Sequence, residues 1–105
     1  MVAKRLLLTG DTMSAAELQR AGLLSDVFAD SEFEEGVRKL ALRIAEKSPL
    51  GLGLIKQLVA ESLERGIDEA LRLELRTNAV YCLSYDMQEG ISAFAERRKP
   101  QFLGR

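Results

Sequence analysis

The chain has 105 residues, which is the size of one small domain or of part of a larger fold. Hydrophobic residues make up 47% of it, and no apolar run approaches the roughly 18 residues that a membrane span needs. The net charge is −1, but residues 1–96 carry 11 Lys/Arg against 16 Asp/Glu, a net −5, while residues 97–105 carry four cations and no acid. This distribution argues against broad contact with nucleic acid and leaves room for one compact anion at the basic end.

The first 28 residues predict two short helices and one extended piece. The segment "VAKRLLL" is typical of the end of a helix, with Gly10 as its stop. In "SAAE", Ser14 and Glu17 have the spacing of a capping box, and Gly22 ends the short helix that follows. We expect residues 23–28, "LLSDVF", to form a brief extended, strand-like segment.

Two further helices are predicted between residues 30 and 66. Either Asp30 or Ser31 is expected to cap the first, whose apolar residues recur every three or four positions. They are Phe33, Val37, Leu40, Ala41 and Ile44. Ser48 and Pro49 end that helix and begin the next, as N-cap and first helical residue. The expected inward face of this next helix consists of Leu54, Ile55, Leu58 and Val59.

The last two helices are predicted to begin after Asp68 and Ser84, each acting as an N-cap. Apolar residues of the first spread around most of its circumference, so we expect it to be buried on two sides. They are Ala70, Leu71, Leu73, Leu75, Ala79, Val80 and Leu83. The final helix should turn Met87, Ile91 and Phe94 inward, with Gly90 and Ala93 permitting close approach. The fold class is therefore mainly α, with four or five short helices and one strand fragment.

The residues that carry chemistry are few. The absence of histidine excludes Ser–His–Asp and Cys–His arrangements and most transition-metal sites. A single cysteine, Cys82, excludes an internal disulfide, fits a reducing cytosol and lies in an apolar helix, as structural thiols do. The carboxylate pairs Glu34–Glu35 and Glu61–Glu64 are expected to be solvated surface acids. We therefore expect no catalytic residue and no metal site in this chain.

The order of several blocks carries a resemblance. They are "AKRLLLTGDTMSAAELQRAGLLSDVF", "SPLGLGLIKQ", "DEALRLEL" and "SYDMQEGISAFAERRKPQF". Together they resemble the C-terminal part of an enoyl-CoA hydratase/isomerase (crotonase) superfamily member, over essentially all 105 residues. Gly51 and Gly53 depart from the Ala-rich start of the corresponding family helix.

The resemblance implies a deficit of catalytic groups. In the family, an N-terminal spiral of ββα units supplies two backbone donors for the thioester oxygen and the acid/base carboxylates, commonly two glutamates. All of these positions align upstream of Met1. On this basis, residues 1–105 form a single helical domain lacking the ββα spiral, in which 1–28 is the end of the spiral-core region and 29–105 is the helical oligomerisation region.

The resemblance also implies what the region contributes. In the family it packs subunits into trimers, often paired as hexamers, and lends residues to a coenzyme A site. Phe94 matches the aromatic beside the adenosine of coenzyme A, and Arg97 matches a position that is usually Lys and meets a phosphate. Arg retains the charge but replaces a point charge with a planar fork. A core or interface role for Phe94 and a solvated helix end for Arg97 remain open alternatives.

The expected function is the C-terminal portion of an acyl-CoA hydratase/isomerase of fatty-acid metabolism, cytoplasmic and inactive alone. Its expected partners are further copies of itself (trimer, hexamer or dimer), a possible separate N-terminal half, and acyl-CoA as the family's substrate. We expect no cofactor of its own, no nucleic acid and no membrane. The alternative is a non-catalytic helical oligomerisation or interaction module that needs no coenzyme A.

Overall fold

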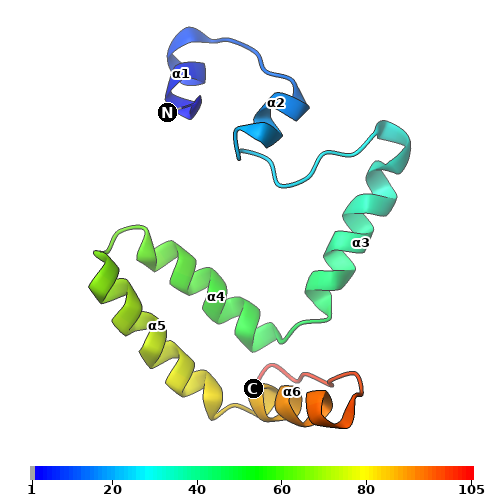
Figure 1. The fold of residues 1–105 in the computed structure, drawn as a ribbon, viewed down its shortest axis with the longest axis vertical. Coiled ribbons are helices and arrows are strands. Elements are labelled where there is room, and N and C mark those ends of the chain that lie inside the picture. The colour runs from blue at the N-terminus through cyan, green and yellow to red at the C-terminus, as the bar shows by residue number, and fades with distance from the viewer. Residues whose placement is uncertain (1) are drawn as a thin grey trace. The chain divides into compact units, whose positions relative to one another are not determined.

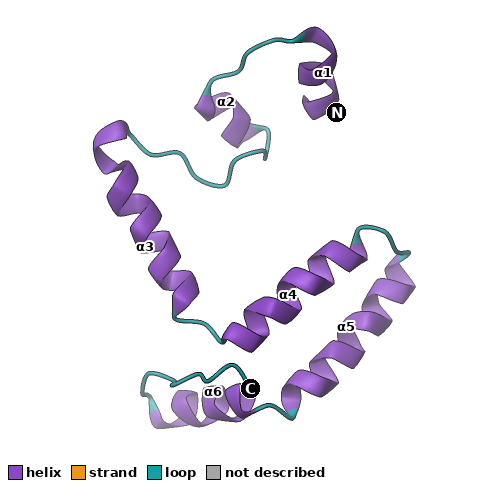
Figure 2. Cartoon of the chain, turned by 180° about the vertical axis from the view of Figure 1, so that it is seen from behind, coloured by secondary structure: helices purple, strands orange, loops and turns teal. Residues whose placement is uncertain are grey.

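The computed structural model describes residues 2–105, which form six α-helices joined by loops and one 3-10 turn (Figure 2). The helices are α1 (Val2–Thr9), α2 (Ala15–Arg20), α3 (Phe33–Ala45), α4 (Pro49–Ser62), α5 (Ile67–Cys82) and α6 (Tyr85–Glu96) (Figure 1). The predicted mainly α class is confirmed. No helix within the described residues is long and apolar enough to cross a membrane.

The predicted strand fragment is wrong. Residues 23–28 form an irregular loop, and no strand occurs anywhere in residues 2–105. A single extended segment leaves its backbone donors and acceptors unpaired, so it becomes a strand only beside another one. No such neighbour exists in the described part of the chain.

Contacts divide the chain into two compact units, one reaching to Leu40 and the other spanning Ala41–Arg105. This is a division by contact, and the expected boundary at residue 28 between regions of a parent fold stays a prediction.

In the first unit, two of the predicted helix ends agree with the structure and a third does not. The hydroxyl of Ser14 accepts from the Glu17 amide at 3.3 Å, and the Glu17 carboxylate accepts from the Ser14 amide at 2.9 Å, which confirms the capping box. Gly22 lies just beyond α2 with φ +75°, a conformation that favours glycine. The predicted cap at Asp30 or Ser31 is wrong, because both residues lie inside a 3-10 turn (Asp30–Glu32) that precedes α3.

The second unit is built on a helical hairpin. Helices α4 and α5 run antiparallel, side by side, in both Figure 1 and Figure 2. Ser48 caps α4 by accepting from the Gly51 amide at 2.9 Å, with Pro49 at the first helical position, as predicted. Helix α5 begins at Ile67 after Gly66, so the predicted cap at Asp68 is wrong. Asp68 lies inside the first turn, where its charge suits the positive end of the helix dipole.

Burial in the hairpin is partial and one-sided. Half-buried residues of α5 recur every three or four positions and so share one face of the helix: Ala70, Leu73, Thr77 and Tyr81. From α4, Leu54 and Leu58 are half-buried, whereas Ile55 and Val59, predicted to face inward, are more than half exposed. The other apolar residues of α5 that the sequence placed around its circumference are exposed: Leu71, Leu75, Ala79, Val80 and Leu83. The α5 surplus of apolar surface is therefore real, and the described chain does not cover it.

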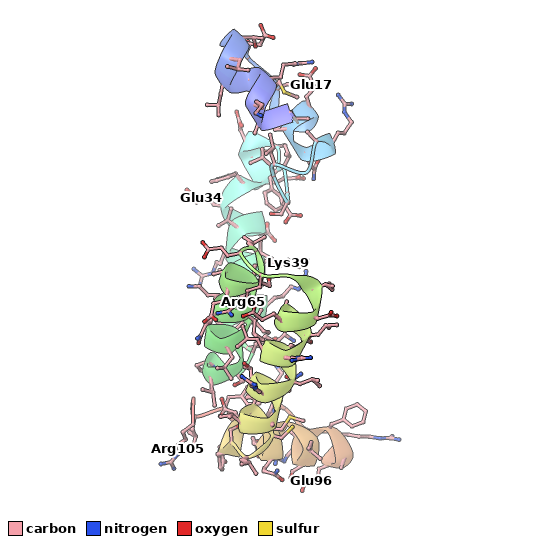
Figure 3. The ribbon with its side chains drawn as sticks, turned by 90° about the vertical axis from the view of Figure 1, so that its left-hand side faces the viewer. Glu17, Glu34, Lys39, Arg65, Glu96 and Arg105 are labelled. Carbon is pink, nitrogen blue, oxygen red and sulfur yellow. The ribbon has the colours of Figure 1, made fainter. Side chains whose placement is uncertain are left out.

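Helix α6 begins as predicted, but its buried face is different. The Ser84 hydroxyl accepts from the Met87 amide at 3.1 Å and caps the helix. Of the predicted inward face, Met87 is half-buried, but Ile91 and Phe94 are exposed. The residues that α6 buries are Asp86, Glu89 and Ala93. Residues 101–105 return along α6 and present backbone amides to it, so the covered face is polar. Glu96 and Arg105 accordingly lie at opposite ends of this region in Figure 3.

Candidate anion-binding corner

The region that holds the predicted site residues is the C-terminal corner, which we define as residues 85–105. It consists of α6 and the nine residues after it. The sequence placed two candidate contacts here, Phe94 and Arg97. The structure adds a buried polar framework beneath them.

Asp86 is the most deeply buried residue of the corner, with 0% of its surface exposed. Its carboxylate accepts from the Ser48 hydroxyl at 2.5 Å and from the amides of Leu103 and Gly104 at 2.7 and 3.0 Å. Its own amide donates to the carbonyl of Arg105 at 3.0 Å. Asp86 therefore ties three parts of the unit together: the start of α4, the start of α6 and the chain end.

Burial is the strongest single influence on the pKa of Asp86 and raises it. The hydrogen bonds from Ser48 and from the tail amides together outweigh burial, so the pKa of Asp86 lies below its usual 3.8. The carboxylate stays ionised at neutral pH.

Glu89 lies one helical turn later on the same face and is only 9% exposed. The Arg98 guanidinium binds it in a bidentate manner, donating from Nη1 to Oε1 at 2.6 Å and from Nη2 to Oε2 at 2.9 Å. The Gln101 amide donates a third hydrogen bond, to Oε1 at 2.7 Å. The side-chain bonds from Arg98, followed by the Gln101 amide, outweigh burial and lower the pKa of Glu89 from 4.5 to about 2. The same pairing raises the pKa of Arg98.

The predicted contact residues lie on the outside of this framework. Phe94 is 88% exposed, and Arg97 is exposed at the C-cap of α6. Arg97 has φ +55° and is the one residue other than glycine among residues 2–105 with a positive φ. Its amide donates to the carbonyl of Phe94 at 3.3 Å, and the Arg98 amide donates to that of Ala93 at 3.0 Å, which closes the helix end.

The three consecutive cations have different environments. Arg98 is paired with Glu89 and with the exposed Glu96, while Lys99 lies 3.4 Å from Glu46 with both groups exposed. No ion pair involves Arg97 within residues 2–105. Arg97 is therefore the cation of this run that has no ion pair in the described chain, while the Lys99 side chain remains 91% exposed in its pair with Glu46.

Phe102 links the corner to the helical hairpin. Its ring contributes to a hollow of about 350 Å³ between α4 and α5 and to another of about 270 Å³ beside α6. Phe94 also lines the second hollow, whereas Arg97 lines neither. An added Cβ at Gly90 would lie 3.7 Å from the Phe102 ring, an ordinary contact distance, so the packing of Phe102 against α6 does not require glycine there.

The acids that matter here were missed in the sequence. Of the predicted surface acids, Glu34, Glu35 and Glu64 are exposed as expected, whereas Glu61 is half-buried and paired with Arg65. The available signal was the i, i+3 spacing of Asp86 and Glu89, which puts two acids on one face of the helix, followed by an arginine and a glycine-containing tail. Within residues 2–105, no group of three or more Cys, Asp or Glu side chains is arranged to hold a metal ion.

Comparisons with known proteins place the chain in a family. The family model described as enoyl-CoA hydratase/isomerase matches residues 1–105. The 2,3-dehydroadipyl-CoA hydratase of Escherichia coli K12 is 36% identical over 104 residues, covering 99% of this chain and 41% of that protein. The crotonyl-CoA hydratase of Syntrophomonas wolfei is 35% identical, covering 99% of this chain and 40% of that protein.

A solved structure agrees in fold. The crystal structure of an enoyl-CoA hydratase from Bacillus anthracis superposes with a TM-score of 0.92 at 29% identity, covering 98% of this chain and 40% of that one. The chain thus spans about two fifths of the length of the relatives it matches. On sequence and fold together, this chain belongs to the enoyl-CoA hydratase/isomerase family.

Proposed function

We propose that this chain is the helical C-terminal region of an acyl-CoA hydratase/isomerase. In this role it supplies a surface for subunit packing and the part of the coenzyme A site that meets a phosphate. It does not catalyse the reaction alone. The observation that carries the proposal is the state of Arg97, which is exposed and left-handed at the end of α6 while its neighbour Arg98 is bound to a buried carboxylate.

The chemistry of Arg97 suits a phosphate. Guanidinium is always charged and presents parallel donors that match phosphate oxygens, so such pairs are stronger than neutral hydrogen bonds. A left-handed backbone at a residue other than glycine costs roughly 1–2 kcal/mol. Strain of this kind persists where the surrounding structure holds it, and it concentrates at ligand sites. Phe94, exposed one turn earlier, offers an apolar ring for the adenosine.

The relatives support coenzyme A, rather than a particular acyl group, as the shared ligand. Their names include hydratases, a methylmalonyl-CoA decarboxylase and a 1,2-epoxyphenylacetyl-CoA isomerase, so the reaction varies while the thioester carrier does not. A C-terminal corner that holds the carrier fits each of these reactions.

The carboxylates of this unit are poorly suited to acid/base catalysis. A general acid or base works best with a pKa near the working pH. Both buried acids have lowered pKa values, and their oxygens are occupied by Arg98, Ser48 and backbone amides. The catalytic donors and glutamates implied by the family would belong to the ββα spiral, in the same polypeptide or in a separate one.

A cytoplasmic location fits the single cysteine. Cys82 is exposed and has no partner for a disulfide in this sequence, which suits a reducing compartment.

Calorimetric titration of coenzyme A and dephospho-coenzyme A tests the phosphate contact. We expect Arg97→Ala to weaken coenzyme A binding by roughly tenfold or more, the value of one charge-assisted hydrogen bond, and to leave dephospho-coenzyme A nearly unchanged. Arg76→Ala, which removes an exposed cation from α5, is the matched control and should change neither. Unchanged affinity for both ligands would assign Arg97 to the helix end alone, and equal losses would place its contact on the diphosphate that the two ligands share.

The second candidate function is a helical interaction module that needs no coenzyme A. The exposed apolar residues of α5 favour it, because contiguous apolar surface usually marks an interface. Association of the chain without any detectable coenzyme A binding would support this candidate over the first.

A further inference from the structure

The buried face of α6 is polar, and Glu89 on that face binds the side chain of Arg98. Glu89 accepts three hydrogen bonds, two from Arg98 and one from the Gln101 amide. These donors lie one and four residues beyond Arg97. Glu89 therefore holds the chain on the C-terminal side of the left-handed residue.

We propose that Glu89 is a positioning residue for Arg97. By binding the Arg98 guanidinium and the Gln101 amide, it fixes the reversal of the chain after Glu96 and keeps Arg97 left-handed with its side chain in solvent. The ligand-binding part of this inference rests on the proposed function. The conformational part is a property of the chain itself.

The left-handed state of Arg97 needs such a partner. Helices commonly close with a left-handed residue, but that residue is usually glycine, which has no Cβ to clash. Arginine pays the steric penalty there and would relax if the following residues were free. The backbone hydrogen bonds from the amides of Arg97 and Arg98 favour a left-handed residue at this helix end. They do not offset the steric penalty of a Cβ, and the bonds to Glu89 act in addition to them.

The burial of Glu89 separates it from the other acid on Arg98. Glu96 accepts from Nε of the same guanidinium at 2.6 Å, but the Glu96 side chain is 61% exposed. Exposed ion pairs contribute little, whereas a buried carboxylate cannot lose its partner without a desolvation penalty. Glu89, and not Glu96, is therefore the acid that holds Arg98 in place.

The pairing with Glu89 also gives Arg97 and Arg98 different side-chain environments. Arg98 is drawn inward by Glu89, which leaves Arg97 as the outward guanidinium. A phosphate at this corner would consequently meet Arg97 and find Arg98 already engaged. Of the two adjacent arginines, the pairing with Glu89 thus leaves only Arg97 with a guanidinium free to bind a phosphate.

The test compares Glu89→Gln with Glu96→Gln in the full chain, using two measurements. The first is the backbone chemical shifts of Arg97 by NMR, which report a left-handed residue without any ligand. The second is the ratio of coenzyme A to dephospho-coenzyme A affinity by calorimetry. Both variants remove one charge from the same guanidinium's partners, so they differ mainly in which partner is buried.

We expect Glu89→Gln to abolish the left-handed shifts of Arg97 and to lower the affinity ratio to that of Arg97→Ala. Glu96→Gln should leave both measurements as in the unsubstituted chain. Left-handed shifts that survive Glu89→Gln overturn the inference, whatever the ligand data show. An affinity ratio near one in the unsubstituted chain, with shifts that respond to Glu89→Gln, contradicts the proposed function and leaves Glu89 as the residue that sets the Arg97 backbone.

Arg98→Lys is the second variant, in case Glu89→Gln does not fold. It keeps the positive charge but replaces the two-armed grip with a single ammonium. With the helical circular dichroism preserved, we expect weakened left-handed shifts at Arg97 and an intermediate affinity ratio. Unchanged shifts in this folded variant would also overturn the inference.

Discussion

Two buried carboxylates on one face of α6, Asp86 and Glu89, bind the residues that follow the helix. Acidic side chains are rarely buried unless they are paired, because removing a charge from water is costly. Asp86 and Glu89 meet that condition in different ways. Asp86 is surrounded by a hydroxyl and backbone amides, and Glu89 is held by a guanidinium fork. Both arrangements stabilise the ionised form.

Glu89 makes the stability of the chain depend on acidity. Because its pKa is lowered from 4.5 to about 2 in the folded chain, its contribution is present above about pH 4.5 and is lost as the pH falls towards 2. We predict that Glu89→Gln is less stable than the unsubstituted chain near neutral pH and that the difference shrinks as the pH falls from 4.5 to 2. Urea unfolding at a series of pH values measures it. A difference that stays constant over this range would show that the ionised form of Glu89 is not favoured by folding.

Ser48 differs from Ser84 in having a second partner, the buried carboxylate of Asp86. Its hydroxyl accepts from the Gly51 amide and donates to Asp86, whereas Ser84 accepts from the Met87 amide alone among the side-chain bonds described. Losing a serine N-cap costs about 0.5–2 kcal/mol. We predict that Ser48→Ala destabilises the chain more than Ser84→Ala, because it also removes a donor from a buried carboxylate. Urea unfolding of the two variants gives the comparison, and equal losses would mean that the bond to Asp86 contributes nothing.

At the level of helices, the sequence predicted the start of a helix correctly where a serine cap marks it. Ser14, Ser48 and Ser84 were identified as caps because their spacing to the next residues is a property of a few positions. Asp30 and Asp68 are also residues that commonly cap helices, but each lies inside the first turn instead. An aspartate stabilises either position, as a cap or through the helix dipole, so composition alone does not separate them.

The buried face of α6 was not predictable from periodicity. Met87, Ile91 and Phe94 have helical spacing, and such a stripe normally faces the core. In this chain the tail carries unpaired amides back along the helix, and carboxylates satisfy them. That pairing depends on the path of the tail, which turns at Gly104 with φ +76°. Phe94 lies in the last turn of α6 and Arg97 at its C-cap, and their contact with coenzyme A stays a prediction. The buried carboxylates beside them were not predicted.

Two helical glycines offer a test of local packing. An added Cβ at Gly53 meets no atom within 4 Å, whereas one at Gly36 would lie 2.5 Å from the ring of Phe28. Alanine is favoured over glycine in a helix interior by roughly 1 kcal/mol. We therefore predict that Gly53→Ala raises the free energy of unfolding by up to about that amount, while Gly36→Ala lowers it. Thermal or urea unfolding measures both, and a stabilising Gly36→Ala would show that the Phe28 ring moves aside freely.

The whole chain leaves much apolar surface to water. Leu83 is 87% exposed, and the outer residues Leu71, Leu75 and Val80 of α5 are at least half exposed. Ala93 is the one apolar residue that is fully buried within residues 2–105. Surface of this kind usually finds a partner. In the family resemblance, the ββα spiral and neighbouring subunits would cover it.

The isolated chain should lack hydratase activity. The resemblance implies that the family's backbone donors and catalytic glutamates do not align with residues of this chain, and the buried acids here are engaged in hydrogen bonds within the fold. Purified chain mixed with crotonyl-CoA should show no enzymatic loss of the enoyl absorbance. Turnover in the usual range of about 1–1000 per second would contradict this.

Light scattering coupled to size exclusion, at micromolar concentration, tests most directly whether the uncovered faces of the helical unit are interfaces. Identical chains usually associate with closed symmetry, and the family precedent favours a trimer, with a dimer as the other expected form. We predict a mass two or three times that of the 11.7 kDa chain, or a higher multiple. A monodisperse monomer would contradict the account, because it would mean that the exposed apolar residues of α5 do not form an interface between copies of the chain.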